Sequence, residues 1–315
     1  MWQKIQPSDL HNFFQGLTDD LKVKLCDILE HESFEYRFLN DKESKSVFTD
    51  INFKLQAGIF KDVSAENSKT TEARHTVWNS VWDETFEKYA ASGFADEALN
   101  PKFVGGHHIF RINGKFAESR SLSIEFLFYR LVRAWMIDCY LRHADEIWEL
   151  GCGSGFNIAY LADQMPQKKF VGLDWATGSQ KILNAMAEAK GMDISGGKID
   201  FFDPPLKLDL NNAAVFTFCA LEQIGHRHNN ITETIIASKP KFCVHMEPII
   251  ENYDCNNPFD KLAYDYHIKR GYLNGFKENL YLLQEEGRLE ILYDQRMNIG
   301  SYFHEGFNLI AWAPA

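Results

Sequence analysis

The sequence has no excess of positive charge. Its 315 residues include 33 lysines and arginines against 44 aspartates and glutamates, which gives a formal net charge of -11 at pH 7. Proteins that bind the phosphate backbone of DNA or RNA usually present a basic face, so nucleic acid is not expected as a partner. A small molecule or a neutral glycan is the better expectation for what the protein binds.

Long apolar runs and paired cysteines are also missing. No run of about 18 apolar residues is present to span a bilayer, and Met1–Ile5 lacks the apolar core of a signal peptide. The six cysteines form no C-x-x-C pair, so free thiols in a reducing compartment are expected rather than a zinc ribbon. We therefore expect a cytoplasmic protein without a membrane span or a metal site. The composition indicates nothing about the oligomeric state.

Helical patterns dominate the first 105 residues. Residues 18–29 have the pattern of a capped amphipathic helix, and residues 69–91 that of a second helix. The aromatic residues of the second helix recur every three or four positions and form one stripe, which predicts a face toward the core or toward a substrate pocket: Trp78, Trp82, Phe86 and Tyr89. Gly105-Gly106 marks a break in composition. We interpret residues 1–105 as an N-terminal helical cap or substrate domain and residues 106–315 as a second domain.

The second domain begins with a hairpin and a helix and then alternates strands with helices. Ile112-Asn113-Gly114-Lys115 predicts a tight turn, and residues 121–142 a long helix. Short apolar strands are predicted at residues 147–150, 170–173, 198–202, 213–218 and 242–246. Such alternation predicts an α/β fold with a mostly parallel sheet. The last two strands, at residues 288–297 and 307–312, leave no room for a crossover helix and must be antiparallel.

A glycine-rich loop follows the first of these strands. Glycines at positions 151, 153 and 155 allow positive φ angles and let a ligand approach the backbone closely. The dinucleotide fingerprint G-x-G-x-x-G is the main competing interpretation. It needs glycine at position 156 or 158, where the chain has Phe156 and Ile158. The spacing therefore excludes the dehydrogenase form of this loop.

The segment Glu149-Leu150-Gly151-Cys152-Gly153-Ser154-Gly155 resembles motif I of the class I S-adenosylmethionine-dependent methyltransferases, an acidic residue and then G-x-G-x-G. The resemblance extends over about residues 120–315. It implies a seven-stranded, Rossmann-like, mostly parallel sheet whose last strand is antiparallel, and S-adenosylmethionine as the cofactor. It also implies that the loop, including Cys152, passes under the methionine part of the cofactor, and that Glu149 supports the loop.

The same resemblance assigns further cofactor contacts. Asp174, at the end of the second strand, has two oxygens that can accept hydrogen bonds from the ribose hydroxyls; capping the following helix is its alternative role. Trp175 can pack on the adenine ring. Asp203, beside Phe202, is expected to accept a hydrogen bond from the adenine amino group, and Asp200 is the weaker candidate because it is expected within the strand. Ala220 and Leu221, after the fourth strand, should lie against the cofactor.

Methyl transfer to a hydroxyl needs a base that removes the proton. Candidate bases lie in the loops after the fourth and fifth strands: His226 first, because a histidine titrates near neutral pH, then Glu222, His228 and Glu247. An exposed polar loop is the competing interpretation of residues 226–230. A metal site at His226-x-His228 is disfavoured because no pair of carboxylates has a matching spacing.

The acceptor is the least determined part of the function. The lead-in from Gly106-His107-His108 to Lys115, followed by a long helix and motif I, is faintly similar to sugar O-methyltransferases, which favours a small-molecule, sugar or glycan hydroxyl. An N-methyltransferase acting on an amine or a peptide and a non-catalytic cofactor-binding subunit are the alternatives. The Asn/Asp-Pro-Pro-Tyr motif of enzymes that methylate bases or glutamine is replaced here by Ala220-Leu221-Glu222-Gln223.

Overall fold

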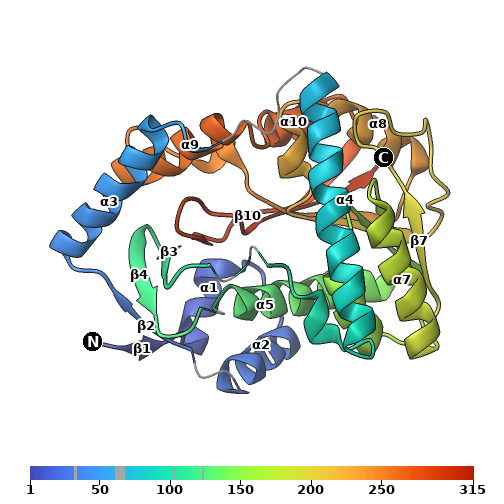
Figure 1. Ribbon diagram of the computed structural model, residues 1–315, viewed down its shortest axis with the longest axis horizontal. Helices are drawn as coiled ribbons and strands as arrows, with labels where there is room; N and C mark the ends of the chain where they lie inside the picture. The colour runs from blue at the N-terminus through green and yellow to red at the C-terminus, as the bar shows by residue number, and fades with distance from the viewer. Residues whose placement is uncertain (32–33, 61–67, 103, 105, 123) are drawn as a thin grey trace.

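A seven-stranded sheet lies at the centre of the structure (Figure 1). The computed structural model describes residues 1–31, 34–60, 68–102, 104, 106–122 and 124–315. The strand order is β10-β12-β9-β8-β5-β6-β7. In chain order the strands are β5 (Glu146–Leu150), β6 (Lys169–Asp174), β7 (Ile194–Lys198), β8 (Ala213–Phe218), β9 (Phe242–Glu247), β10 (Leu289–Arg296) and β12 (Asn308–Pro314).

The strand directions confirm the predicted sheet. The five strands from β7 to β9 pair in parallel. Strand β12 is antiparallel to both of its neighbours, β9 and β10. The reversed strand is therefore inserted between β9 and β10, and the carboxyl ends of the parallel strands meet at one edge of the sheet.

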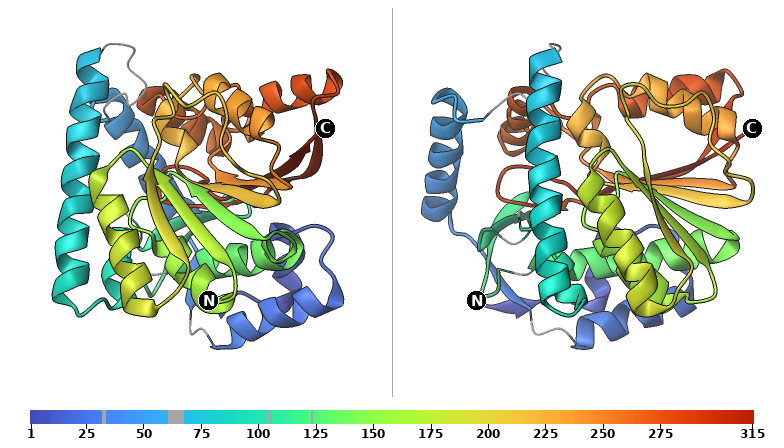
Figure 2. Two further views of the ribbon diagram at one scale, coloured as in Figure 1. Left: turned by 90° about the vertical axis from the view of Figure 1, so that its right-hand side faces the viewer. Right: turned by 45° about the vertical axis from the view of Figure 1, so that its right-hand side comes forward.

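Helices cover both faces of the sheet (Figure 2). One hydrophobic cluster includes side chains of α5 (Ile124–Cys139), α6 (Phe156–Gln164) and α7 (Thr177–Lys190). The other includes side chains of α8 (Asn229–Ser238) and α10 (Phe276–Glu285). The buried faces of these helices and the inner parallel strands, of which β8 is buried along its whole length, together make the core of a three-layer α/β domain.

The third strand lies four residues earlier than predicted, at Ile194–Lys198 instead of residues 198–202. Gly196 and Gly197 are poor strand formers, so the prediction followed the apolar residues behind them. A Cβ on Gly196 would lie 2.9 Å from the Cα of Gln180 in α7, so glycine is what lets this helix pack closely on the edge strand. As a result Asp200, which was predicted inside the strand, lies in the loop that follows it.

A second sheet joins segments that are distant in the sequence. Its order is β1 (Gln3–Lys4), β2 (Glu35–Phe38), β4 (Lys115–Ser119), β3 (Ile109–Ile112) and β11 (Ile299–Gly300). The predicted hairpin turn connects β3 and β4, with positive φ angles at Asn113 and Gly114. Strands β1 and β2 were missed because two and four residues are too few to show an alternation.

The N-terminal helices pack on the rest of the chain. They are α1 (Leu10–Phe13), α2 (Asp19–His31), α3 (Asp41–Gln56) and α4 (Ser68–Ala91). Side chains of α1, α2 and α5 share one hydrophobic cluster. The predicted boundary falls on residue 105, which lies outside the described residues, and the second sheet takes strands from both sides of it. A separate N-terminal cap domain therefore stays a prediction.

Helix α4 runs along α7 beside the central sheet (Figures 1 and 2). Residues of the predicted aromatic stripe lie in different surroundings. Tyr89 is fully buried in the core, whereas Trp78 and Trp82 line a cavity beside the loop that follows β5. A Cβ on Gly178 of α7 would lie 2.5 Å from the carbonyl carbon of Trp82. Glycine at this position therefore allows the backbones of α4 and α7 to touch.

Within the described ranges, no helix is both long enough and apolar enough to cross a bilayer.

Candidate active site

The loop after β5 is built from glycines in the left-handed region. The φ angles are 78° at Gly151, 50° at Gly153 and 70° at Gly155, which begins α6 as its N-cap. A Cβ on Gly151 would lie 2.4 Å from the Cβ of Ala220, and one on Gly153 would lie 2.8 Å from the indole of Trp82. Both the backbone conformation and the space beside it therefore require glycine.

Glu149 lies at the end of β5, directly before this loop, and its expected role of supporting the loop stays a prediction. Its side chain is buried, and its Oε1 accepts a hydrogen bond of 2.8 Å from Nδ2 of Asn157 in α6. Burial raises the pKa of this carboxyl group to about 8, which the hydrogen bond from Asn157 only partly offsets.

Asp174 clamps the same loop from the end of β6. Its Oδ2 accepts a hydrogen bond from the backbone N–H of Gly153, and its Oδ1 accepts one from Ala176, each at 2.9 Å. Burial raises the pKa of Asp174 to about 6. The N-cap residue of α7 is Ala176 and the helix has no side-chain cap, so Asp174 orients the residue that begins the helix and does not cap its first turn. Each carboxylate oxygen has a second lone pair, so the side chain can still accept hydrogen bonds from a ligand.

The loop opens into a single cavity of about 500 Å³. The half beside the glycine loop is lined by α4, that loop, the start of α6 and the ends of β6 and β7, with these residues: Trp78, Trp82, Glu149, Gly151, Cys152, Gly153, Ser154, Phe156, Asn157, Asp174, Trp175, Ile199, Phe201 and Phe202. The ends of β8 and of α5 contribute Cys219, Ala220, Glu222, Glu125 and Tyr129. The opposite half is lined mainly by α9 (Pro258–Arg270) and by the segment after β11.

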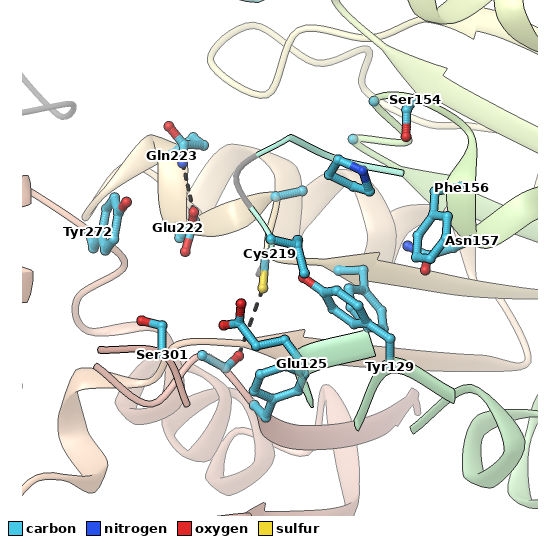
Figure 3. A pocket seen from close by; sticks show the side chains of 18 of the residues that line it. Glu125, Tyr129, Ser154, Phe156, Asn157, Cys219, Glu222, Gln223, Tyr272 and Ser301 are labelled. Carbon is cyan, nitrogen blue, oxygen red and sulfur yellow. Dashed lines mark hydrogen bonds between the residues drawn. The ribbon is translucent and has the colours of Figure 1, made fainter. Parts of the chain in front are cut away.

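Figure 3 shows how these parts face one another. Ser154 and Asn157 lie on one side of the cavity, Glu222 and Tyr272 lie on the other, and Cys219 lies between them. Cys219 has a φ of 52°, so the chain turns sharply as it leaves β8. This turn leads into the 3₁₀ helix Leu221–Ile224, which carries Glu222 to the cavity wall.

Six of the predicted site residues do not line the cavity. Gly155 begins α6 and Leu221 is packed in the core. Asp203 is exposed and lies in the connection after β7, which ends four residues earlier than predicted. The other three, His226, His228 and Glu247, are candidate bases.

The two histidines that were predicted as candidate bases lie outside the cavity. His226 is exposed. His228 is buried in the core, where its Nε2 lies 3.1 Å from the carbonyl oxygen of Asn274, and burial lowers its pKa. Over the ranges that the structure describes, no three His, Cys, Asp or Glu side chains gather as metal ligands.

The two glutamates have different surroundings. Glu222 lines the cavity, and its Oε1 accepts a hydrogen bond of 2.8 Å from Nε2 of Gln223. Burial and, next, the charge of Glu247 raise the pKa of Glu222 to about 8. Glu247 is fully buried behind the same turn and accepts hydrogen bonds from three backbone N–H groups, those of Ala220, Leu221 and Glu222.

Sequence reasoning missed most of the half opposite the glycine loop. Seven of its residues come from α5, from α9 and from the segments after α9 and β11: Glu125, Tyr129, Tyr266, Arg270, Tyr272, Ser301 and His304. The ring of Tyr272 packs edge-on against Tyr266, with centroids 5.7 Å apart, and the guanidinium of Arg270 lies 5.2 Å from the centroid of the Tyr272 ring. The density of aromatic residues in 264–272 and 302–307 was the available signal, but aromatic residues are as common in cores as in binding sites.

Comparison with known proteins gave structural matches alone. No protein-family model and no curated protein sequence matches this chain. Among solved structures, the methyltransferase domain of bacterial CtHen1-C is 14% identical with a TM-score of 0.41, over 58% of this chain and 94% of that chain. The magnesium protoporphyrin IX methyltransferase of Synechocystis PCC 6803, solved with bound SAH, is 14% identical with a TM-score of 0.42, over 60% and 82%.

A third match is an O-methyltransferase from neocarzinostatin biosynthesis, solved with S-adenosylmethionine and a naphthoic acid. It is 11% identical with a TM-score of 0.38, over 61% of this chain and 58% of that chain. The fold assignment rests on the sheet itself: five parallel strands in the order β7-β6-β5-β8-β9, extended by a reversed strand and then by β10. By this strand order the chain has the Rossmann-like fold of the class I methyltransferases.

Proposed function

We propose that the protein is an enzyme that transfers a methyl group from S-adenosylmethionine to a hydroxyl group of a small molecule or sugar. One observation carries this proposal: the glycine loop, Asp174 and the carboxylate of Glu222 line the same cavity. A donor held at the loop and an acceptor held beside Glu222 would share one enclosure. In-line transfer requires such a juxtaposition of the two reactants.

The half of the cavity beside the glycine loop, here called the cofactor half, fits S-adenosylmethionine. Gly151 and Gly153 line it without side chains, so a ligand can approach their backbone from the cavity. Asp174 keeps lone pairs for the ribose hydroxyls, and the rings of Trp175 and Phe202 line the part where adenine would pack. When bound, the cofactor would supply a methyl group on a positively charged sulfur, so that an acceptor oxygen could bond to the methyl carbon as the carbon–sulfur bond breaks and the neutral thioether leaves.

Glu222 is the base in this proposal, in place of His226. A base has to reach the proton that it removes, so its position is decided first and its pKa second. Glu222 lines the cavity, whereas His226 and His228 do not. A carboxyl group whose pKa is raised to about 8 accepts a proton far better near neutral pH than an ordinary glutamate does.

The acceptor half favours a small ring. Aromatic side chains surround it, including Tyr129, Tyr266, Tyr272 and Phe303. Such rings can stack on a planar acceptor or on the apolar face of a sugar. Arg270 adds one positive charge to the same wall, where an acidic substituent of the acceptor can bind.

Isothermal titration with S-adenosylmethionine tests the cofactor. We expect a measurable heat of binding, and neither heat nor a thermal shift with the wild-type protein would contradict the proposal. Transfer of a labelled methyl group to a panel of phenols, sugars, glycans and amines then tests the acceptor. Transfer to amines alone would favour the N-methyltransferase alternative, and binding without transfer to any member would favour the non-catalytic subunit.

A further inference from the structure

A line of buried polar side chains crosses three neighbouring strands of the central sheet. The Nε1–H of Trp312 in β12 donates to Nε2 of His245 in β9 over 2.9 Å. Nδ1 of His245 lies 2.9 Å from the hydroxyl of Thr217 in β8. Thr217 pairs with His245 in the sheet, so Glu247, two residues further along β9, lies on the same face, and interaction with the Thr217 hydroxyl lowers the pKa of Glu247. All four side chains are at most 1% exposed.

The direction of each hydrogen bond in this line follows from the first. An indole N–H can only donate, so Nε2 of His245 must accept and the proton of the ring lies on Nδ1. Burial lowers the pKa of His245 to about 3, so the ring stays neutral at any working pH. Nδ1 therefore donates to Thr217, which leaves the hydroxyl proton of Thr217 directed to Glu247.

Glu247 connects these hydrogen bonds to the turn that forms part of the cavity wall. Its Oε1 accepts from the backbone N–H groups of Ala220 and Leu221 at 3.0 and 3.1 Å, and its Oε2 accepts from Glu222 at 3.2 Å. These three N–H groups begin the turn that carries the side chain of Glu222 into the cavity. The position of that turn depends on a carboxylate oriented by its hydrogen bonds.

We infer that Trp312, His245 and Thr217 are positioning residues that act through Glu247 to hold the turn carrying Glu222. This inference rests on the proposed function for its catalytic meaning, since it concerns the same cavity. Its structural content, the coupling between a tryptophan in β12 and the carboxyl group of Glu222, can be measured without any turnover.

A purely structural role is the alternative. Buried polar groups need hydrogen-bond partners in every protein, so the line could do no more than satisfy its own atoms. The two readings differ in what they predict for Glu222. Loss of packing alone lowers the stability of the fold. Loss of the line of polar side chains from Trp312 through His245 and Thr217 to Glu247, here called the relay, also changes the pH at which Glu222 titrates.

The expected direction follows from the charges around Glu222. Without the Thr217 hydroxyl, the carboxylate of Glu247 loses a donor, so Glu247 takes up a proton at higher pH. A neutral Glu247 no longer repels the charge on Glu222. The titration midpoint of the Glu222 carboxyl group, the pH at which it is half ionised, therefore falls. The other titratable groups that face Glu222 are unchanged by these substitutions: Cys219, Tyr129, Tyr266, Arg270 and Tyr272.

Carboxyl ¹³C NMR of protein labelled in the glutamate side chains measures this midpoint, with Glu222→Gln identifying the resonance. We expect Thr217→Val to lower the midpoint of Glu222 by about 0.5–1 pH unit. Trp312→Phe should do the same. It frees Nε2 of His245, so the ring can take the other tautomer and accept from Thr217, which then no longer donates to Glu247. Thr217→Ser retains the hydroxyl and should keep the wild-type midpoint.

The chain offers a matched control for the loss of an indole. Trp135 is also 1% exposed and lies in the hydrophobic cluster on the other face of the sheet. Trp135→Phe removes the same atoms from a core and should lower the melting temperature without moving the Glu222 midpoint. The double variant Thr217→Val/Trp312→Phe should shift the midpoint no further than either single variant, because both interrupt one line.

The outcomes separate this inference from the proposed function. Equal midpoints in Trp312→Phe and Trp135→Phe, or shifts that add in the double variant, would overturn the relay whether or not the protein binds S-adenosylmethionine. If a transferase activity is found, the same two relay variants should also lower kcat more than they raise the KM of the acceptor, because Glu222 acts as the base in the proposed function. Failure of wild-type protein to bind the cofactor overturns only the proposed function.

Discussion

The backbone N–H of Glu222 donates to Oε2 of Glu247 over 3.2 Å, so one buried carboxylate holds the turn that presents another to the cavity. The negative charge of Glu247 is the second cause, after burial, of the raised pKa of Glu222. The pKa of Glu247 is itself raised by burial, to about 7. The pKa values of both carboxyl groups are therefore raised into the range where an enzyme works.

This pair predicts the pH dependence of turnover. With Glu222 as the base, only its ionised form accepts the acceptor proton, so kcat/KM should rise with pH and level off above about 8. Glu222→Gln should lower kcat by about 10²–10⁴-fold and remove this limb, while cofactor affinity stays unchanged. Steady-state kinetics between pH 5.5 and 9 check both expectations.

His226→Ala is the control for that experiment. His226 lies on the same connection but outside the cavity, so its variant should retain the rate and the pH limb of the wild type. A lost limb in His226→Ala together with a retained one in Glu222→Gln would return the role of base to the histidine.

Asp174 provides a test of the cofactor site. Asp174→Ala should weaken binding of S-adenosylmethionine by about 1–3 kcal/mol, because it removes the acceptor for the ribose hydroxyls and releases the N–H of Gly153. Calorimetric titration measures the loss. Asp174→Asn retains one acceptor oxygen, so its affinity for S-adenosylmethionine should lie between those of the wild type and the alanine variant. An unchanged affinity in the alanine variant would contradict the ribose role.

Gly153→Ala tests the close contact between the loop and α4. The new Cβ would have to displace the indole of Trp82 from 2.8 Å, so we expect a loss of cofactor affinity of at least about tenfold. Gly191→Ala is the matched control, since Gly191 has a similar φ of 62° and nothing within 4 Å of the added atom. It should lower stability by about 1 kcal/mol and leave the affinity unchanged. Similar affinities for the two variants would argue against the steric explanation.

Glu149 predicts a pH-dependent stability. Its folded-state pKa, raised to about 8 from the ordinary 4.5, means that the folded protein binds more protons than the unfolded chain between these values. Its contribution to stability is thus complete below about pH 4.5 and is lost as the pH rises toward 8. Glu149→Gln keeps the acceptor for Asn157 and carries no charge to bury.

The melting temperature of Glu149→Gln should therefore exceed that of the wild type at pH 8 and approach it at pH 4.5. Each kcal/mol corresponds to about 2–4 °C in a chain of this size. A difference in melting temperature that does not change with pH would show that the buried carboxyl group is not the cause.

Sequence reasoning succeeded where function depends on residues that are close in the chain. Gly151, Gly153 and Asp174 sit at strand ends whose register follows from local apolar runs, so their shared location was predictable. The third strand was misplaced because Gly196 and Gly197 form it only through the packing of α7, which no local propensity records.

The other half of the cavity depends on contacts between distant segments. Glu125, Tyr272 and His304 meet there from α5 and from two connections at the end of the chain. The turn at Cys219 decides that Glu222, and not His226, faces inward. The hydrophobic periodicity of the sequence predicts neither the meeting of these segments nor the turn at Cys219. One residue of the predicted loop of candidate bases lines the cavity, but which one does so was decided by tertiary structure.

The packing of Trp82 has an evolutionary consequence. Its indole meets the site of a Cβ on Gly153, and its backbone meets that of Gly178, so one residue of α4 restricts two positions in the sheet domain. In related sequences, a small residue at position 82 would release the steric constraint at 153 but not the one at 178, which is set by backbone atoms. Tryptophan at 82 should therefore co-vary with glycine at 153, while glycine at 178 should persist wherever α4 packs on α7.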